Sequence, residues 1–406
     1  MNRDIQLDTI DGGITAPAGF IAGGIHAKIR KKKPDLAILA STVPASVAGV
    51  FTTNKAQAAP ILVSKIQVKR SPLCSAVVVN SGNANACTGE RGLNDAWAMV
   101  RTTAAALNLP EEQVLVSSTG VIGQYLPIDN VLQGITDLAP DLNVEGAHEA
   151  ALAIMTTDTY HKELAVRFPL GGVTVTIGSM AKGSGMIAPN MATMLGFVTT
   201  DAAISNDVLQ KMLVSANGKS FNRISVDGDT STNDMVLVMA NGLAGNAPIV
   251  EGSPEYDQFT DALEYVLITL AKMIARDGEG ATKLIEVVVT GAASEADATA
   301  AARSVANSNL VKTAVHGEDA NWGRIITAVG YSGIDFDPDL VSISLNELPV
   351  LLPNYEIVLD EEKAKVVLAN ENIVITIDLN QGEHRANFWT CDLTKEYVHI
   401  NASYRS

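Results

Sequence analysis

Short runs of β-branched residues alternate along this chain with segments that have the spacing of amphipathic helices. Most runs are bounded by Gly, Ser or Asn, which is typical of strands. The strands expected from these runs are Ala76–Val79, Val114–Val116, Val173–Ile177, Ile285–Thr290 and Ile373–Ile377, with Val341–Leu345 and Asn387–Thr390 in addition. This alternation, together with only 5% aromatic residues, predicts a layered α/β fold.

Three segments carry the helical pattern. Asn94–Leu109 has Ala, Met and Leu at helical spacing. Ser253–Arg276 starts with a Ser that can cap the helix and a Pro that suits the first turn, and its apolar residues fall on one face. An Ala-rich helix is expected over Glu295–Ala302, with an extension to about Val311.

Composition excludes several classes of protein. Hydrophobic residues make up 47% of the 406 residues, enough for large cores, so a disordered chain is excluded. The 45 Asp and Glu outnumber the 29 Lys and Arg, which gives a net charge of −16. An acidic chain repels phosphate backbones, and the longest basic cluster is Lys28–Lys33. We therefore expect no nucleic-acid partner.

The cysteines and the N-terminal region predict a cytoplasmic protein. Cys74, Cys87 and Cys391 form no CxxC pair and give no disulfide framework, which suits a reducing compartment. The first 13 residues carry several charges and contain no signal-peptide core. The low-charge stretch Leu36–Phe51 is too short to span a bilayer. The expectation is a soluble intracellular protein with no membrane partner.

The common catalytic and cofactor motifs are absent from the sequence. It contains no HExxH, GxSxG, GxxxxGK[ST] or GxGxxG pattern. Six histidines are scattered along the chain without metal-ligand spacing. They are His26, His148, His161, His316, His384 and His399. We therefore predict no metal site and no cofactor from the motifs.

The segment 181–201, AKGSGMIAPNMATMLGFVTTD, is the most distinctive of the chain. One interpretation is a turn that enters a buried strand or helix, with Thr193 as an ordinary β-branched residue. In the other, the bond between Ala192 and Thr193 is cut and Thr193 gains a free α-amine, with a pKa of about 7.7–8. That amine can act as the base for its own hydroxyl, so one residue supplies both nucleophile and base. The residues alone leave both interpretations open.

The motif KGSGMIAPNMATML resembles the self-cleavage segment of the ornithine acetyltransferase family, the glutamate N-acetyltransferases of arginine biosynthesis. Six further blocks resemble the family in the same order, so the resemblance covers nearly the whole chain. They are Phe51–Lys65, Val78–Gly89, Ser117–Gly123, Ser225–Val236, Arg276–Lys283 and His316–Gly333.

The resemblance implies a fold and a set of catalytic residues. The implied fold is the αββα sandwich shared with self-processing aminopeptidases. Thr193 matches the nucleophile, and Ala192–Thr193 matches the bond cut by autoproteolysis. Cleavage would give an α chain, 1–192, and a β chain, 193–406, which fold together as one body and associate as α2β2. Thr119 and Gly120 match the pair that stabilises the oxyanion, in agreement with an SSTG sequence just after a strand.

The resemblance also implies substrate-binding residues. They are Thr156, Lys182, Thr193, Glu279, Asn401 and Ser406. Lys182 suits the α-carboxylate of a substrate, although a solvated loop lysine is the alternative interpretation. Thr157 and Thr159 are alternatives to Thr156 within the same segment. Asn401 and Ser406 lie in a terminal segment that the residues alone predict to be frayed.

The implied activity is a ping-pong transfer of acetyl from N2-acetylornithine to glutamate through an acetyl-Thr193 ester. Some family members also accept acetyl-CoA as donor, and the sequence leaves that second activity open. The alternatives are a self-processing amidohydrolase or aminopeptidase that uses water as acceptor, and a binding protein that keeps the fold without catalysis.

Overall fold

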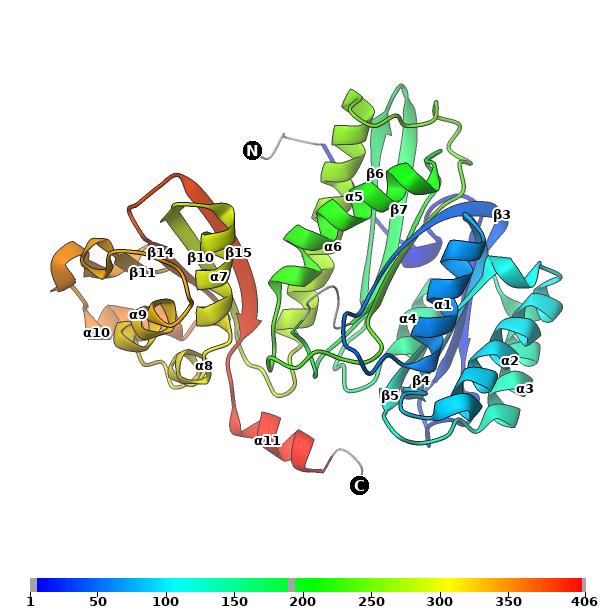
Figure 1. The fold of residues 1–406 in the computed structure, drawn as a ribbon, viewed down its shortest axis with the longest axis horizontal. Coiled ribbons are helices and arrows are strands. Elements are labelled where there is room, and N and C mark those ends of the chain that lie inside the picture. Colours follow the sequence, from blue (N-terminus) through cyan, green and yellow to red (C-terminus); the bar gives the residue numbers. More distant parts are fainter. Residues whose placement is uncertain (1–5, 189–193, 404–406) are drawn as a thin grey trace. The chain divides into compact units, whose positions relative to one another are not determined.

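The computed structural model describes residues 6–188 and 194–403. The chain divides into two compact units (Figure 1). Unit 1 comprises Met1–Gly183, Pro189–Asn222 and Thr230–Leu270, and unit 2 comprises Ser184–Ala188, Arg223–Asp229 and Ala271–Ser406. The two short segments of unit 2 interrupt the sequence of unit 1, and none of the boundaries between the units coincides with the predicted cleavage bond at 192–193.

Unit 1 is built on one nine-stranded mixed sheet. Its strand order is β1-β6-β7-β8-β9-β3-β4-β5, with β2 paired to β3. The β4/β5 and β8/β9 pairs are parallel and the other pairs are antiparallel. The strands are β1 (Asp8–Ile10), β2 (Phe20–Ile25), β3 (Leu36–Phe51), β4 (Leu73–Asn83), β5 (Val114–Val121), β6 (Lys162–Leu170), β7 (Val173–Lys182), β8 (Leu195–Thr200) and β9 (Met235–Ala240).

Helices cover this sheet on both faces. They are α1 (Ala59–Arg70), α2 (Gly89–Leu107), α3 (Ile128–Leu138), α4 (Ala147–Ile154), α5 (Asn206–Lys219) and the part up to Leu270 of α6 (Pro254–Arg276). The alternation of side chains along β3 shows why both faces are apolar. Ile38 packs in a core with residues of α2 and α3, whereas its neighbour Leu39 packs in a second core with residues of α4.

Unit 2 contains a six-stranded sheet in the order β13-β12-β11-β14-β10-β15. The strands are β10 (Leu284–Ala292), β11 (Ser342–Leu345), β12 (Leu348–Leu352), β13 (Glu356–Ile357), β14 (Asn372–Asp378) and β15 (His384–Cys391). Its helices are α7 (Glu295–Ala306), α8 (Asn309–His316), α9 (Trp322–Gly330), α10 (Glu361–Leu368) and α11 (Lys395–Ala402). Alternate residues of β10 and β14 are buried, and they form one apolar core with α7, α8 and α9.

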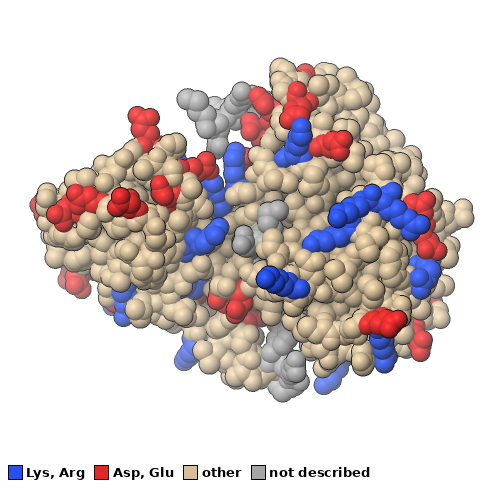
Figure 2. All heavy atoms as spheres, in the orientation of Figure 1, with Lys and Arg blue, Asp and Glu red and all other residues tan. Residues whose placement is uncertain are grey.

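The acidic excess of the chain is visible on the surface of unit 2. Figure 2 shows several Asp and Glu side chains over this unit, at the left of the view. The start of α10 contributes Asp360, Glu361 and Glu362, all of which are at least partly exposed. No helix in the described part of the chain is long and apolar enough to cross a membrane.

The structure confirms the predicted α/β class and most of the predicted elements. Each of the seven predicted strands overlaps a strand of the structure. Ser253 caps α6 as expected, because its hydroxyl accepts a hydrogen bond from the amide of Tyr256 at 3.2 Å. The predicted extension of the Ala-rich helix to Val311 is wrong. Helix α7 ends at Ala306, and Ser308 begins the separate helix α8 by accepting from the amide of Val311.

Candidate functional site

The Thr119-Gly120 pair lies at the end of β5, where this strand runs parallel to β4. Gly120 is opposite Gly82 and has a φ of +134°. A Cβ at position 120 would lie 2.5 Å from the amide nitrogen of Asn83, so only glycine fits here. Thr119 is 9% exposed. The predicted oxyanion pair therefore occupies a strand end whose backbone is fixed by its neighbour.

The segment that leads into β9 links this strand end to the start of β8. The side-chain amide of Asn233 donates to the carbonyl of Ser118 at 2.8 Å. Two residues later, the amide of Met235 donates to the carbonyl of Met194 at 3.0 Å. Asn233 and Met235 lie in one short segment of unit 1. This segment is therefore hydrogen-bonded both to Ser118, which precedes the predicted oxyanion residue Thr119, and to Met194, which follows Thr193.

Asp234, in the middle of that segment, is a buried acid. It is 2% exposed, and its Oδ2 atom has no hydrogen-bond partner in the described part of the chain. Burial raises the pKa of Asp234 well above its ordinary value, although hydrogen bonds from Ser231 and the charge of Lys182 oppose the shift. The environment therefore favours the neutral carboxylic acid.

Lys182 ends β7 directly opposite the first residue of β8, and it is 7% exposed. The carboxylate of Asp158 lies close to it and is fully buried. It accepts hydrogen bonds from the amide of Gly183 at 2.7 Å and from Nζ of Lys162 at 2.8 Å. Burial alone would raise the pKa of Asp158, but the charges of Lys182 and Lys162 hold it below its ordinary value. Asp158 is therefore ionised at neutral pH.

We refer to Asp158, Lys162, Lys182 and Asp234 as the buried charge cluster. The charges of Lys182 and Lys162 lower the pKa of Asp158, and the charge of Lys182 also opposes the rise in the pKa of Asp234. A buried cation attracts an anion strongly because the local dielectric constant is low. The cluster is suited to bind a carboxylate group of a substrate.

Thr156 is held beside the same cluster. Its amide donates to Oδ2 of Asp158 at 2.9 Å, and its carbonyl accepts from the guanidinium of Arg30 at 3.2 Å. The Arg30 side chain passes over Gly82, where a Cβ would lie 2.5 Å from its Cγ. Both Thr156 and Thr157 are half-buried, so burial does not separate these two alternatives.

In unit 2, Glu279 and Asn401 are brought together. Nδ2 of Asn401 donates to Oε2 of Glu279 at 2.7 Å, and Glu279 is 7% exposed. Gly185 packs directly against this carboxylate, and any side chain at position 185 would overlap it. The frayed tail expected from the residues alone is wrong for Asn401, which lies in the helix α11.

The segment Ser184–Ala188 is held by other residues of unit 2. The carboxylate of Asp227 accepts from the amides of Met186 at 2.7 Å and Ile187 at 2.8 Å, and the hydroxyl of Tyr397 donates to it at 3.2 Å. Burial, and then the charges of Asp227 and Glu279, raise the pKa of Tyr397, which keeps it protonated as a donor. The chain directly before residues 189–193 is therefore anchored by the carboxylate of Asp227.

The family model of the ArgJ family matches residues 21–406. The chain belongs to the ArgJ family. It is 56% identical, over 98% of its length and the whole of the relative, to the arginine biosynthesis bifunctional protein ArgJ of Symbiobacterium thermophilum. The protein of the same name from Caldanaerobacter subterraneus subsp. tengcongensis is 51% identical over 98% of this chain and the whole of that relative.

A solved ArgJ structure from Bacillus halodurans is also similar. It is 48% identical and has a TM-score of 0.51, covering 52% of this chain and the whole of that chain. The resemblance to the family noted in the sequence is thus confirmed, and the fold is consistent with the αββα sandwich that it implied.

Three of the residues predicted for an ArgJ-type site lie outside the described residues: Ala192, Thr193 and Ser406. The other predicted residues fall in both units. Thr119, Gly120, Thr156 and Lys182 belong to unit 1, and Glu279 and Asn401 belong to unit 2. In unit 1, Thr156 and Gly183, which follows Lys182, both donate to Asp158, and in unit 2 Asn401 donates to Glu279.

The sequence analysis missed the residues that support this site. Asp158 lies in the MTTDT segment, where only the threonines were considered. Asp227, Asn233 and Asp234 lie in the block Ser225–Val236, which carried the resemblance without an assigned role. The sequence signal that could have identified them was the close spacing of Asp and Asn residues directly before a strongly apolar strand. Polar side chains that are buried beside such a strand need hydrogen-bond partners.

Proposed function

We propose that this ArgJ-family chain is a glutamate N-acetyltransferase that moves acetyl from N2-acetyl-L-ornithine to L-glutamate. Its relatives carry the name of a bifunctional protein of arginine biosynthesis, and we propose N-acetylglutamate synthesis from acetyl-CoA as the second activity. The observation that supports the acyl-transfer chemistry best is the pair of hydrogen bonds from Asn233 and Met235. They tie the strand end of Thr119 to the residue that follows Thr193.

In the proposed reaction, autoproteolysis between Ala192 and Thr193 frees the α-amine of Thr193. This amine accepts the hydroxyl proton as Oγ of Thr193 forms a bond to the acetyl carbon of acetylornithine. The hydroxyl or backbone amide of Thr119 and the amide of Gly120 stabilise the tetrahedral oxyanion. Removing one such donor typically slows a reaction 10²–10³-fold.

The tetrahedral intermediate then collapses. Its carbon–nitrogen bond breaks, and the proton held on the α-amine of Thr193 passes to the leaving amine of ornithine. The neutral amine of glutamate attacks the acetyl ester and gives its proton to the Thr193 amine. Cleavage of the ester returns this proton to Oγ and releases N-acetylglutamate.

Substrate positioning in this proposal follows from charge. The buried charge cluster, through Lys182, pairs with the α-carboxylate that acetylornithine and glutamate share. Glu279, held by Asn401, is the acidic group for the side-chain ammonium of ornithine. We further propose that the two chains produced by cleavage assemble as α2β2 in the cytoplasm.

The test is an assay of purified chain with N2-acetylornithine, with and without glutamate. Mass spectrometry measures N-acetylglutamate, and chromatography measures released ornithine. The proposal predicts N-acetylglutamate in amounts equal to ornithine, and neither product from Thr193→Ala. Release of ornithine at the same rate without glutamate, with no N-acetylglutamate formed, would identify a hydrolase that uses water as acceptor instead.

A further inference from the structure

Two histidines and a glutamate meet at the surface of unit 1, in a cluster with no role in the proposed reaction. His148 lies in the first turn of α4, His161 directly precedes β6, and Glu163 lies in β6. Oε2 of Glu163 lies 3.2 Å from Nδ1 of His148 and 3.5 Å from Nε2 of His161. The three ligand atoms all lie within 4.8 Å of one another.

Local structure holds these side chains in place. His161 and Glu163 are two residues apart on an extended chain, so they point to the same side. Helix α4 packs against β6 and β7, which brings its first turn to this point. Gly13, with a φ of +48°, lies so close to Glu163 that a Cβ there would be 2.5 Å from Oε1. One carboxylate oxygen therefore faces the backbone, and the other faces both imidazoles.

The geometry matches that of a transition-metal site. In a tetrahedral zinc site with bonds of about 2.0–2.1 Å, neighbouring ligand atoms lie about 3.3 Å apart. Both distances from Oε2 are close to this value. Two imidazole nitrogens and one carboxylate oxygen are ligands that Zn²⁺ prefers, whereas Mg²⁺ and Ca²⁺ prefer oxygen alone. We infer that His148, His161 and Glu163 form a binding site for a divalent transition-metal ion of the Zn²⁺ type.

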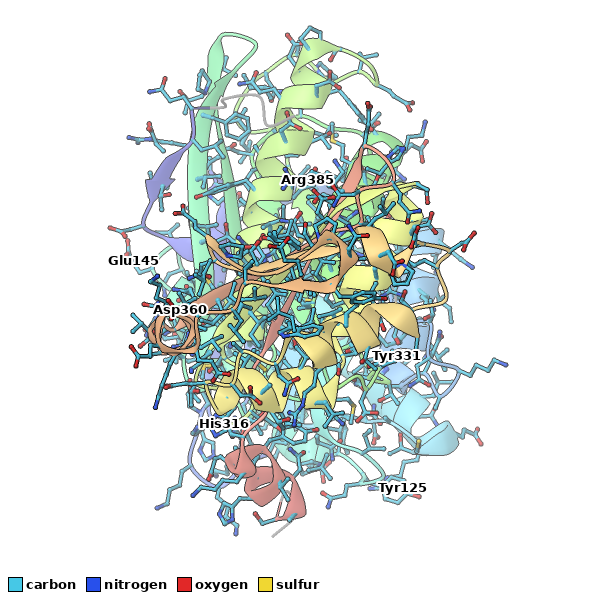
Figure 3. All side chains as sticks on the ribbon, turned by 90° about the vertical axis from the view of Figure 1, so that its left-hand side faces the viewer. Tyr125, Glu145, His316, Tyr331, Asp360 and Arg385 are labelled. Atoms are coloured by element: carbon cyan, nitrogen blue, oxygen red, sulfur yellow. The ribbon has the colours of Figure 1, made fainter. Side chains whose placement is uncertain are left out.

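The surroundings leave room for a further ligand. The two imidazoles are 53% and 44% exposed, whereas the Glu163 side chain is 15% exposed. A hollow of about 350 Å³ adjoins the cluster and is lined by Asp11 and Glu145 as well as by His148 and Glu163. The Glu145 side chain is exposed at the edge of unit 1 (Figure 3). A water molecule can therefore complete the coordination. An ion here would join the start of α4 to the start of β6 and stabilise the folded form of unit 1.

The experiment is a calorimetric titration of the full chain, prepared without a histidine tag and freed of metal with a chelator, using ZnCl₂ alone. We expect one equivalent to bind with a Kd tighter than about 100 μM. The variants His161→Ala and Glu163→Gln should each weaken binding at least tenfold, since each removes one of three ligands. The matched control is His384→Ala, which removes an exposed histidine at the start of β15 in unit 2 and should bind as the wild type does.

A second readout separates loss of the site from loss of the fold. Zn²⁺ should raise the thermal unfolding temperature of the wild type and of His384→Ala, but not that of His161→Ala. Circular dichroism of all the variants should be the same. No saturable binding to the wild type would overturn the inference, and the cluster would then be a hydrogen-bonded His–Glu–His group only. Equal binding by the wild type and His161→Ala would also overturn it, because the ion would then lie elsewhere.

Discussion

Replacing Asp158 by asparagine should strongly destabilise unit 1. The Lys162–Asp158 ion pair has 0% exposure on both sides, and a neutral amide at position 158 would remove the carboxylate that interacts with the charges of Lys162 and Lys182. Removing one partner of a buried pair usually costs about 3–5 kcal/mol. The carbonyl of Tyr160 at 3.3 Å and its ring at 4.8 Å still interact with Nζ of Lys162, which favours the lower end, about 3 kcal/mol. That loss lowers the ratio of folded to unfolded protein by more than about 100-fold.

Urea unfolding, followed by circular dichroism, measures this loss. The matched control is Glu251→Gln, which breaks the exposed pair with Lys211 and should leave the midpoint unchanged. Adding Lys162→Met to Asp158→Asn should recover part of the stability, because it removes a buried charge that has lost the Asp158 carboxylate. An Asp158→Asn protein as stable as the wild type would refute the reasoning.

The Lys162–Asp158 ion pair should also make the free energy of unfolding decrease as the pH falls into the acid range. The folded-state pKa of Asp158 lies below its ordinary value, so the folded form favours the carboxylate and this stabilisation is fully present above about pH 4. It is lost as the pH falls further toward the depressed folded-state pKa. Asp158→Asn should abolish that part of the acid sensitivity, and an unchanged acid limb of the stability curve would contradict the assignment.

Three further predictions concern other residues of the candidate site. Gly120→Ala should reduce kcat at least about 100-fold, because a Cβ would displace the strand end. The control is Gly123→Ala, which should keep activity in the same assay. Gly123 also has a positive φ, +78°, but a Cβ there would have no atom within 4 Å. In the wild type, the folded form keeps a proton on Asp234 that the unfolded form loses, so the free energy of unfolding should fall by about 1.4 kcal/mol per pH unit above about pH 4. Asp234→Asn should remove this decline. Urea titrations at several pH values test it, and identical slopes for the wild type and the variant would count against it. Asn401→Ala should raise KM for acetylornithine about tenfold with an unchanged unfolding midpoint, because Glu279 loses a donor. An unchanged KM would show that Asn401 does not position Glu279 for substrate binding.

Local pattern was sufficient to predict some of the regular elements. The strand at Val114–Val116 and the helix capped by Ser253 depend on neighbouring residues, so short-range spacing identifies them. The break between α7 and α8 was missed because the helical pattern of the Ala-rich segment, which ends at Ala306, was extended through residues 307–309 to Val311. Ser308 instead caps the start of the separate helix α8. One continuous helix and two helices separated by a cap are local structures of similar propensity for this segment.

The supporting residues of the site could not be predicted because their partners are distant in sequence. Asp158 accepts from Gly183, and Asn233 donates to Ser118, across separations that only the sheet topology closes. The role of Asn401 likewise depends on contact with Glu279, which no terminal pattern indicates. His316 also has a partner distant in sequence: it lies at the end of α8 (Figure 3), and its Nδ1 atom is 2.9 Å from the carboxylate of Asp392.

The central claim is that Thr193 becomes an N-terminal nucleophile, and intact mass under denaturing conditions tests it most directly. Dividing the chain mass of 42.7 kDa in proportion to residues 1–192 and 193–406 predicts two species of about 20 and 22 kDa. The larger should begin at Thr193 by N-terminal sequencing, and Thr193→Ala should remain one chain. A wild-type chain that is active yet has a single mass of 42.7 kDa would contradict the account, because no free α-amine would exist at Thr193.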